Sequence, residues 1–185
     1  MMKTCWISLR MLVLLTLLTG GVYPLLITLV GHQLWPKEST GSLVYAPSGT
    51  LVGSALLAQK FTQAQYFHPR PSAADYIAVP SGASNQSGTS QAFANRVQKQ
   101  RQQTGDATPA ELLTTSASGL DPHLSVESVR YQVRRVGEAR KLSESQLHRL
   151  QVQIHLQTTY PLLGFIGKKV VNVLLLNQAL DREFP

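Results

Sequence analysis

The hydrophobic positions are unevenly distributed, and the longest apolar run lies near the start of the chain. Residues 11–31 carry no charged side chain and are mostly Leu, Val, Ile and Thr. At about 1.5 Å per residue, a helix of this length reaches roughly 31 Å, the thickness of a bilayer's hydrocarbon core. The apolar core of a signal peptide spans only about 7–15 residues, and no clear small-x-small cleavage site follows the run. The pattern predicts an uncleaved transmembrane helix over residues 11–31, with a cleaved signal as the alternative.

The charges on either side of this run predict its orientation. Lys3 and Arg10 precede it, whereas the first charges after it, Lys37 and Glu38, cancel. The positive-inside rule places residues 1–10 in the cytoplasm and residues 32–185 on the far side of the membrane. We therefore expect a single extracytoplasmic (periplasmic) domain attached to one span.

Small residues and a proline interrupt the apolar run. Pro24 lacks a backbone donor and is expected to kink the helix, and Gly20 and Gly21 would let another helix approach closely. Two interpretations remain open: a slightly irregular anchor facing lipid, or a span that packs against a partner helix.

The pattern after residue 32 is typical of an α+β domain. Two short apolar runs around a Pro/Gly turn predict a β-hairpin over residues 42–54. A helix with a thin apolar face is expected over residues 92–103, and Gly105 ends it. The apolar run 169–176 is typical of a buried strand, and residues 177–182 of a closing helical turn.

Two further helices are indicated by caps and spacing. Ser125 is placed to cap the first, whose inward positions recur at helical spacing. Ser143 and Gln146 form a capping box for the second. The positions expected to face the core are Val126, Val129, Val133, Val136, Leu147, Leu150 and Ile154.

Composition narrows the function classes. Cys5, before the span, is the only cysteine, so the outer domain has no disulfide, thiolate metal site or cysteine nucleophile. Beyond the span there are 15 basic and 10 acidic residues, and the positive charges form small groups with few aromatics between them. This pattern argues against a nucleic-acid surface and favours a solvated face, or one opposed to anionic lipid or an acidic partner.

The densest cluster of reactive side chains is Thr114–His123. Ser118, Asp121 and His123 are a conceivable nucleophile, orienting group and base, which makes a membrane-anchored extracytoplasmic serine hydrolase the alternative function. However, the G-x-S-x-G turn is absent. The alternative, purely structural interpretation of this cluster is a turn that starts the next helix. The scattered histidines lack metal-site spacing, and Gly164–Lys169 lacks the spacing of a phosphate loop. We expect neither a catalytic nor a metal site.

The segment Tyr66-Phe67-His68-Pro69-Arg70-Pro71 is stiffened by two prolines and rich in residue types of interface hot spots. It is either a partner-binding surface or a rigid core loop with Phe67 buried.

These strings carry a resemblance to a known family. The chain is similar to the C subunit of the bacterial Kdp potassium-transporting ATPase. The matching positions are Gly21–Pro24, Gly41–Leu43, Gly53-Ser54, Tyr66–Ala73, Ser81–Asn85, Thr114–His123, Gln132, Arg135, Arg140, Val171–Leu174, Leu176-Asn177 and Ala179–Asp181. It departs from the family pattern at Gln86–Gly88 and at Lys168-Lys169.

The resemblance implies a single-pass accessory subunit in the bacterial inner membrane, needed for assembly and activity, whose partners are a channel-like potassium-binding subunit and a P-type ATPase subunit. It implies a catalytic chaperone that raises the ATP affinity of the ATPase subunit, with no firmly bound cofactor and ATP only through the complex. The small residues of the span and the resemblance together mark Gly20, Gly21, Tyr23 and Pro24 as partner contacts within the membrane. Those that the resemblance marks as partner-binding or functional are Tyr66, Phe67, His68, Pro69, Arg70, Ser116, Ser118, Gly119, Asp121, His123, Gln132 and Asn172.

Overall fold

The computed structural model describes residues 2–184, and the chain divides into two compact units, residues 1–44 and 45–185. The first unit is dominated by one long helix, α1 (Met2–Leu17), η1 (Leu18–Val22) and α2 (Tyr23–Leu34), followed by the short α3 (Pro36–Ser39). By length and composition, residues 2–34 are able to cross a membrane. The helix extends beyond the predicted span at both ends, because residues 2–10 and 32–34 are helical too.

A wider turn interrupts this helix just before Pro24. In η1, a π-helical turn, the amide of Tyr23 donates to the carbonyl of Leu18, five residues earlier. Such turns accommodate local irregularity in a helix, and here the next residue is a proline with no N–H to donate. The irregularity expected at Pro24 takes this form.

The second unit begins with the predicted hairpin. The strands are β1 (Leu43–Tyr45), at the boundary between the units, and β2 (Leu51–Ser54). The amide of Ala46 donates to the carbonyl of Thr50 at 2.8 Å, and Gly49 adopts a φ of +80° in the turn. The prediction for residues 42–54 is confirmed.

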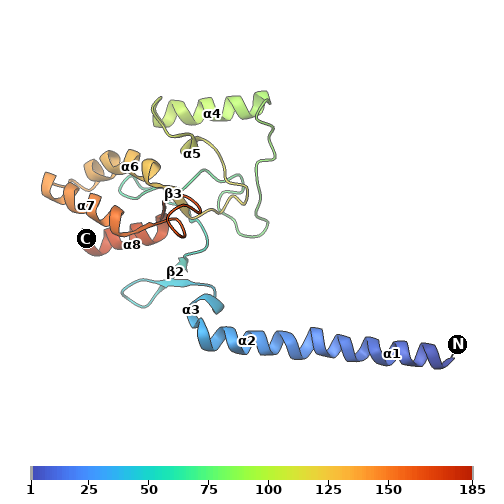
Figure 1. Ribbon diagram of the computed structural model, residues 1–185. Coiled ribbons are helices and arrows are strands. Elements are labelled where there is room, and N and C mark those ends of the chain that lie inside the picture. The colour runs from blue at the N-terminus through green and yellow to red at the C-terminus, as the bar shows by residue number, and fades with distance from the viewer. Residues whose placement is uncertain (1, 185) are drawn as a thin grey trace. The chain divides into compact units, whose positions relative to one another are not determined.

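The sheet and the helices around it form the rest of the domain. The strands β3 (His123–Ser125), β5 (Val170–Asn172) and β4 (Thr158–Thr159) make an antiparallel sheet in that order, with Leu124 opposite Val171. Helices α6 (Val126–Ala139), α7 (Glu144–Leu156) and α8 (Val173–Glu183) lie beside one another next to these strands, while α4 (Gln91–Thr104) and α5 (Ala110–Leu113) form a separate pair (Figure 1).

The helix caps follow the sequence. The hydroxyl of Ser125 accepts the amide of Ser128, and Ser143 with Gln146 completes the capping box. Val129, Val136, Leu150 and Ile154 are buried, as their spacing predicts.

One prediction is wrong in part. The run 169–176 is not a continuous strand, because the strand ends at Asn172 and α8 begins at Val173. The side chain of Asn172 accepts the amide of Leu175 at 3.2 Å and caps the new helix. A short buried apolar run has the same pattern in a strand and in a buried helix, so the pattern alone does not distinguish them.

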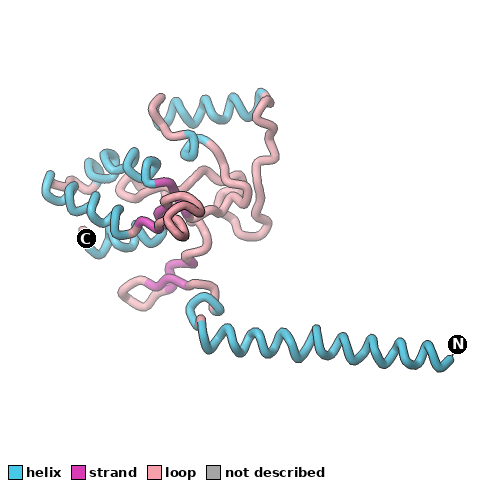
Figure 2. The backbone as a smooth tube through the Cα atoms, viewed as in Figure 1, coloured by secondary structure: helices cyan, strands magenta, loops and turns pink. Residues whose placement is uncertain are grey.

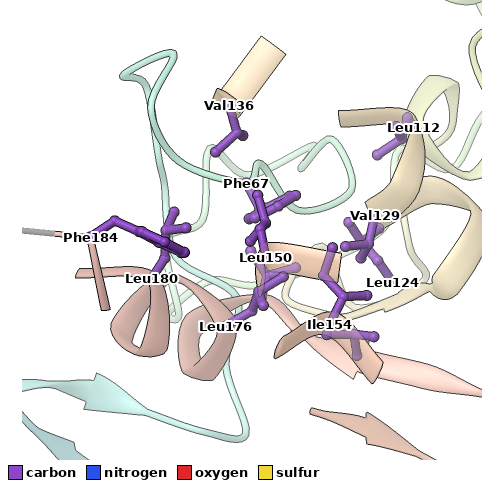
Figure 3. Packing of buried hydrophobic residues seen from close by; sticks show 12 residues of the cluster. Phe67, Leu112, Leu124, Val129, Val136, Leu150, Ile154, Leu176, Leu180 and Phe184 are labelled. Atoms are coloured by element: carbon purple, nitrogen blue, oxygen red, sulfur yellow. The ribbon is translucent and has the colours of Figure 1, made fainter. Parts of the chain in front are cut away.

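Between β2 and α4, residues 55–90 contain no helix or strand, and Figure 2 draws this stretch as one long loop. It nevertheless contributes to the core. Phe67 has no exposed surface and lies in the middle of the labelled side chains of Figure 3. The cluster comprises Phe67, Leu112, Leu124, Val129, Val136, Leu150, Ile154, Val171, Val173, Leu176, Leu180 and Phe184.

Candidate functional site

The segment from Tyr66 to Pro71 is held against the helices by side-chain amides instead of by a neighbouring strand. The amide of Phe67 donates to Oδ1 of Asn177, and Nδ2 of Asn177 donates to the carbonyl of Phe67, both at 2.9 Å. Asn177 is itself buried in α8. Because both backbone groups of a fully buried residue are satisfied by one side chain, Phe67 enters the core without a sheet ladder. Of the two interpretations for Phe67, the buried one is correct.

Gln132 of α6 binds both backbone groups of the next residue, His68, in the same way. Its Oε1 accepts the amide of His68 at 2.8 Å, and its Nε2 donates to the carbonyl of His68 at 3.0 Å. Arg135, one turn further along α6, donates to the same Oε1 and to the carbonyls of Ala64 and Tyr66. We call Asn177, Gln132 and the backbone of Phe67 and His68 that they bind the amide clamp.

The ring of His68 is half-buried and hydrogen-bonded within the segment. Burial lowers the pKa of its ring, and so does the charge of Arg135, whereas the hydrogen bond with the carbonyl of Gln63 raises it; the net shift is downward. With a carbonyl as its partner at 3.0 Å, Nε2 acts as the donor. The imidazole ring of His68 is therefore engaged in a hydrogen bond within the segment and is not placed to act as a base.

Tyr66 lies at the edge of the clamp. Its hydroxyl donates to Asp181 at 3.1 Å, and the guanidinium of Arg140 lies 5.2 Å from its ring centroid. Arg140 also donates to Asp181 and to the carbonyls of Gln65 and Phe184. These contacts join the segment to the end of α8.

Arg70 connects the segment to the hydroxyl-rich loop. Its Nη2 donates to the carbonyl of Thr115 at 3.0 Å, and Nη1 lies 3.8 Å from Oδ2 of Asp121. In turn, the carbonyl of Arg70 accepts the hydroxyl of Tyr76 at 2.8 Å. Burial, with a smaller contribution from Asp75, raises the pKa of Tyr76 to about 12, so this hydroxyl stays a donor.

The loop from Ser116 to His123 has turn geometry. Oγ of Ser118 accepts the amide of Leu120 at 3.1 Å, and Oδ1 of Asp121 accepts the amide of His123 at 3.0 Å. The buried Ser116 accepts the amide of Asp121 at 3.5 Å. Within residues 2–184 no hydrogen bond joins Ser118 to His123, which does not support the hydrolase alternative.

Gly119 packs this loop against the segment around Gly82, which is distant in the sequence. It adopts a φ of +70°, and a Cβ placed on it would lie 2.8 Å from the carbonyl oxygen of Gly82. Only glycine fits such an approach without strain. The strings around Gly82 and Gly119, distant in sequence, are therefore neighbours.

Asn172 has a structural role at the start of α8. Besides capping the helix, its Nδ2 donates to the carbonyl of Ala55 at 2.7 Å. It thereby ties the beginning of the long loop to the sheet.

A cavity of about 740 Å³ opens beside the clamp, between α4 and α6. His68, Pro69 and Gln132 contribute to its wall, together with Tyr131 and Arg135. Across the described residues, no group of three His, Cys, Asp or Glu side chains is placed to hold a metal ion. The side chains of the clamp hold the segment in place within the domain.

In the first unit, the membrane positions are open. Tyr23 is 62% exposed, and beyond the helix's own neighbouring backbone no described atom lies within 4 Å of a Cβ built on Gly20 or Gly21. These positions belong to the η1 turn and the start of α2, which includes Pro24.

The roles of two residues were not predicted from the sequence. Asn177 matches the resemblance but carries no predicted role, although a polar residue among the buried positions Val173, Leu174, Leu176 and Leu180 of α8 is a recognisable signal. Glu111 is the other. Its Oε2 accepts the amide and the hydroxyl of Ser125, at 2.9 and 2.7 Å. Burial acts to raise the pKa of Glu111, but the hydrogen bonds from Ser125 and Ser128 and the charge of Arg70 outweigh it and lower the pKa.

Comparison with known proteins identifies the family. Residues 5–182 match the family described as K+-transporting ATPase, c chain. The potassium-transporting ATPase KdpC subunit of Pseudomonas entomophila is 46% identical over 182 residues, which cover 96% of this chain and 94% of that protein. The KdpC subunit of Myxococcus xanthus is 45% identical, with 100% and 90% covered, and that of Rhodospirillum rubrum is 42% identical, with 100% and 98% covered. With its span, its α+β domain and a match over nearly its whole length, the chain belongs to the KdpC family, the c chain of potassium-transporting ATPases.

Proposed function

We propose that this chain is a non-catalytic accessory subunit of an ATP-driven, high-affinity potassium uptake complex. Its partners are a channel-like potassium-binding subunit and a P-type ATPase subunit, and ATP hydrolysis resides in the latter. The observation that carries the proposal is the full-length family match. The use of Gln132, Asn177 and Arg135 inside the domain supports it, because the hydrogen bonds of these polar groups hold the fold together.

The subunit lies in the bacterial inner membrane with residues 1–10 in the cytoplasm and its α+β domain outside. Lys3 and Arg10 before the apolar run support this orientation. Cys5 allows a direct test, because it is the only cysteine. In intact cells a membrane-impermeant maleimide should leave Cys5 unlabelled, and should label a cysteine placed at the exposed Gln102 in a Cys5→Ser background. Labelling of Cys5 from outside would reverse the orientation.

The span packs against a partner subunit through Gly20, Gly21, Tyr23 and Pro24. The open space around the two glycines and the exposure of Tyr23 support this contact. Replacing residues 11–31 by a plain polyleucine helix should keep the chain in the membrane and weaken assembly. Normal recovery of the complex in mild detergent would leave the helix as an anchor only.

An effect on ATP affinity reaches the ATPase subunit through the complex. A domain outside the cytoplasm does not meet cytosolic ATP, so the chaperone role is a coupling free energy between distant sites. The decisive experiment measures potassium-stimulated ATP hydrolysis by the two partner subunits with and without this chain. We expect a higher apparent KM for ATP without it. An unchanged KM and rate in its absence would contradict the accessory role.

A further inference from the structure

The loop between β4 and β5 displays large apolar side chains to solvent. Leu162 is 69% exposed, Leu163 and Phe165 are each 76% exposed, and Ile166 is 52% exposed. Isolated exposed leucines are ordinary, but four large apolar residues in five consecutive positions form a patch that the fold does not use. We call residues 162–166 the apolar tip.

The apolar tip is an ordered turn held by backbone hydrogen bonds. The amide of Leu162 donates to the carbonyl of Ile166 at 3.1 Å, and the amide of Ile166 donates back at 3.0 Å. Between them Leu163 and Gly164 both have positive φ, +54° and +83°, and the amide of Phe165 donates to the carbonyl of Leu162 at 3.3 Å. This combination is the pattern of a type I′ turn, in which the first central position favours Asn, Asp or Gly.

Leucine at that central position is unfavourable for the fold. A non-glycine residue with φ near +54° is strained, and Leu163 gains no burial within the domain to offset the strain. A strained backbone that holds an exposed side chain points to a role outside the fold. The turn fixes Leu163 and Phe165 in a display that a flexible loop would not maintain.

The surroundings of the apolar tip are basic. Lys168 and Lys169 follow it after Gly167, and Nζ of Lys169 lies 5.3 Å from the ring centroid of Tyr160 at the other side of the loop. Between Glu144 and Asp181 the sequence contains no acidic residue. An apolar tip with an aromatic ring and lysines at its base matches the layering of a membrane surface, in which anionic headgroups overlie acyl chains.

We infer that the apolar tip inserts into the lipid headgroup region, with Lys168 and Lys169 on anionic headgroups. Only residues 35–44 join the candidate span to the second unit, so a span that lies in a bilayer tethers the second unit to that bilayer. The same short tether makes a weak insertion effective, since the local concentration of lipid is high. This second attachment to the membrane is independent of the partner subunits named above.

The test places a nitroxide spin label at Leu163→Cys in the full-length Cys5→Ser chain, reconstituted alone into nanodiscs that contain phosphatidylglycerol. We expect oxygen to relax the label several-fold more effectively than a water-soluble nickel chelate does. The matched reference is Gln102→Cys on the exposed side of α4, where the nickel chelate should dominate. A label at Leu163→Cys with the reference behaviour would overturn the inference, and Phe165→Cys provides an independent second position.

Binding of the apolar tip to a protein instead of to lipid would give different results in this experiment. If shielding of the label appears only after partner subunits are added, the apolar tip binds protein and the inference is wrong. If shielding falls when the number of chains per nanodisc is reduced to one by dilution with lipid, the tip binds a second copy, which also overturns it. Shielding that is present in the chain alone and unaffected by dilution supports insertion into lipid.

The lysines are tested by the double variant Lys168→Gln/Lys169→Gln. Each lysine near an anionic surface is expected to shift the equilibrium between inserted and free tip by about fivefold. The variant should therefore lose shielding in phosphatidylglycerol nanodiscs and resemble the parent in pure phosphatidylcholine. Equal shielding of parent and variant in both lipids would contradict the proposed role of the lysines.

Discussion

At the scale of single residues, two side-chain amides replace regular secondary structure. Asn177 and Gln132 each bind both backbone groups of one residue in the long loop, as a neighbouring strand would. An amide side chain carries one acceptor and two donors, so it matches the C=O and N–H of a peptide residue. The clamp thereby allows Phe67 to be buried from a segment that is neither helix nor strand.

The substitution Asn177→Ala tests the clamp. It leaves the amide and carbonyl of Phe67 buried without partners, which should lower the free energy of unfolding by about 2–4 kcal/mol. The measurement is urea denaturation of the full chain in detergent, followed by circular dichroism. The exposed Gln151→Ala on α7 is the control and should differ little from the parent. Similar stability of both variants would show that the clamp does not hold the domain together.

His68 makes stability depend on pH. Its pKa in the folded chain lies below the usual 6.5, first because the ring is buried. The unfolded chain therefore takes up the proton first as the pH falls, and stability present above about pH 6.5 is lost toward the lower folded pKa. Glu111 adds a similar loss only at lower pH, since its usual value is 4.5.

We expect His68→Gln to reduce this loss. The free energy of unfolding should fall less between roughly pH 7.5 and pH 5.5 in the variant than in the parent, because the titrating ring is absent. His148→Gln, on the exposed side of α7, serves as control. A parent and a His68→Gln variant with parallel pH profiles would exclude His68 as the source.

At the scale of elements, spacing and caps predict helices well and short strands poorly. Ser125, Ser143 and Gln146 cap as expected because capping depends on residues within one turn. The boundary at Asn172 could not be predicted, because the apolar positions on either side are buried by partners far away in sequence. The same holds for the candidate site. Its sequence motifs could be recognised, but the pairing of Gln132 with His68 depends on tertiary packing and could not be predicted.

The contact between the loops around Gly82 and Gly119 provides a prediction at this scale. Gly119→Ala adds a Cβ within 2.8 Å of a backbone oxygen and forces alanine to a φ of +70°. We expect a loss of about 2 kcal/mol in the free energy of unfolding, from strain and the forced separation. Gly88→Ala is the matched control, since nothing lies within 4 Å of its added Cβ. Equal stability of the two variants would show that the loops separate without cost.

At the scale of the whole molecule, the domain is closed by its last helix. Within the clamp, Asn177 bonds with Phe67 across 110 positions, and at its edge Tyr66 bonds with Asp181 across 115. A chain truncated after Asn172 should leave residues 55–90 without these partners and open to proteolysis. Limited trypsin digestion, with cleavage expected after Lys60, checks this against the full chain. Equal resistance of the two chains would mean that the long loop is ordered without α8.

The clamp also has a consequence for biogenesis. A chain is synthesised from its N-terminus, so Phe67 is made 110 positions before its partner Asn177. The domain therefore cannot complete its core until its last helix is made, and Phe67 stays exposed in the meantime. Chaperones that shield apolar segments would act in this interval, and the step that ends it is the arrival of α8.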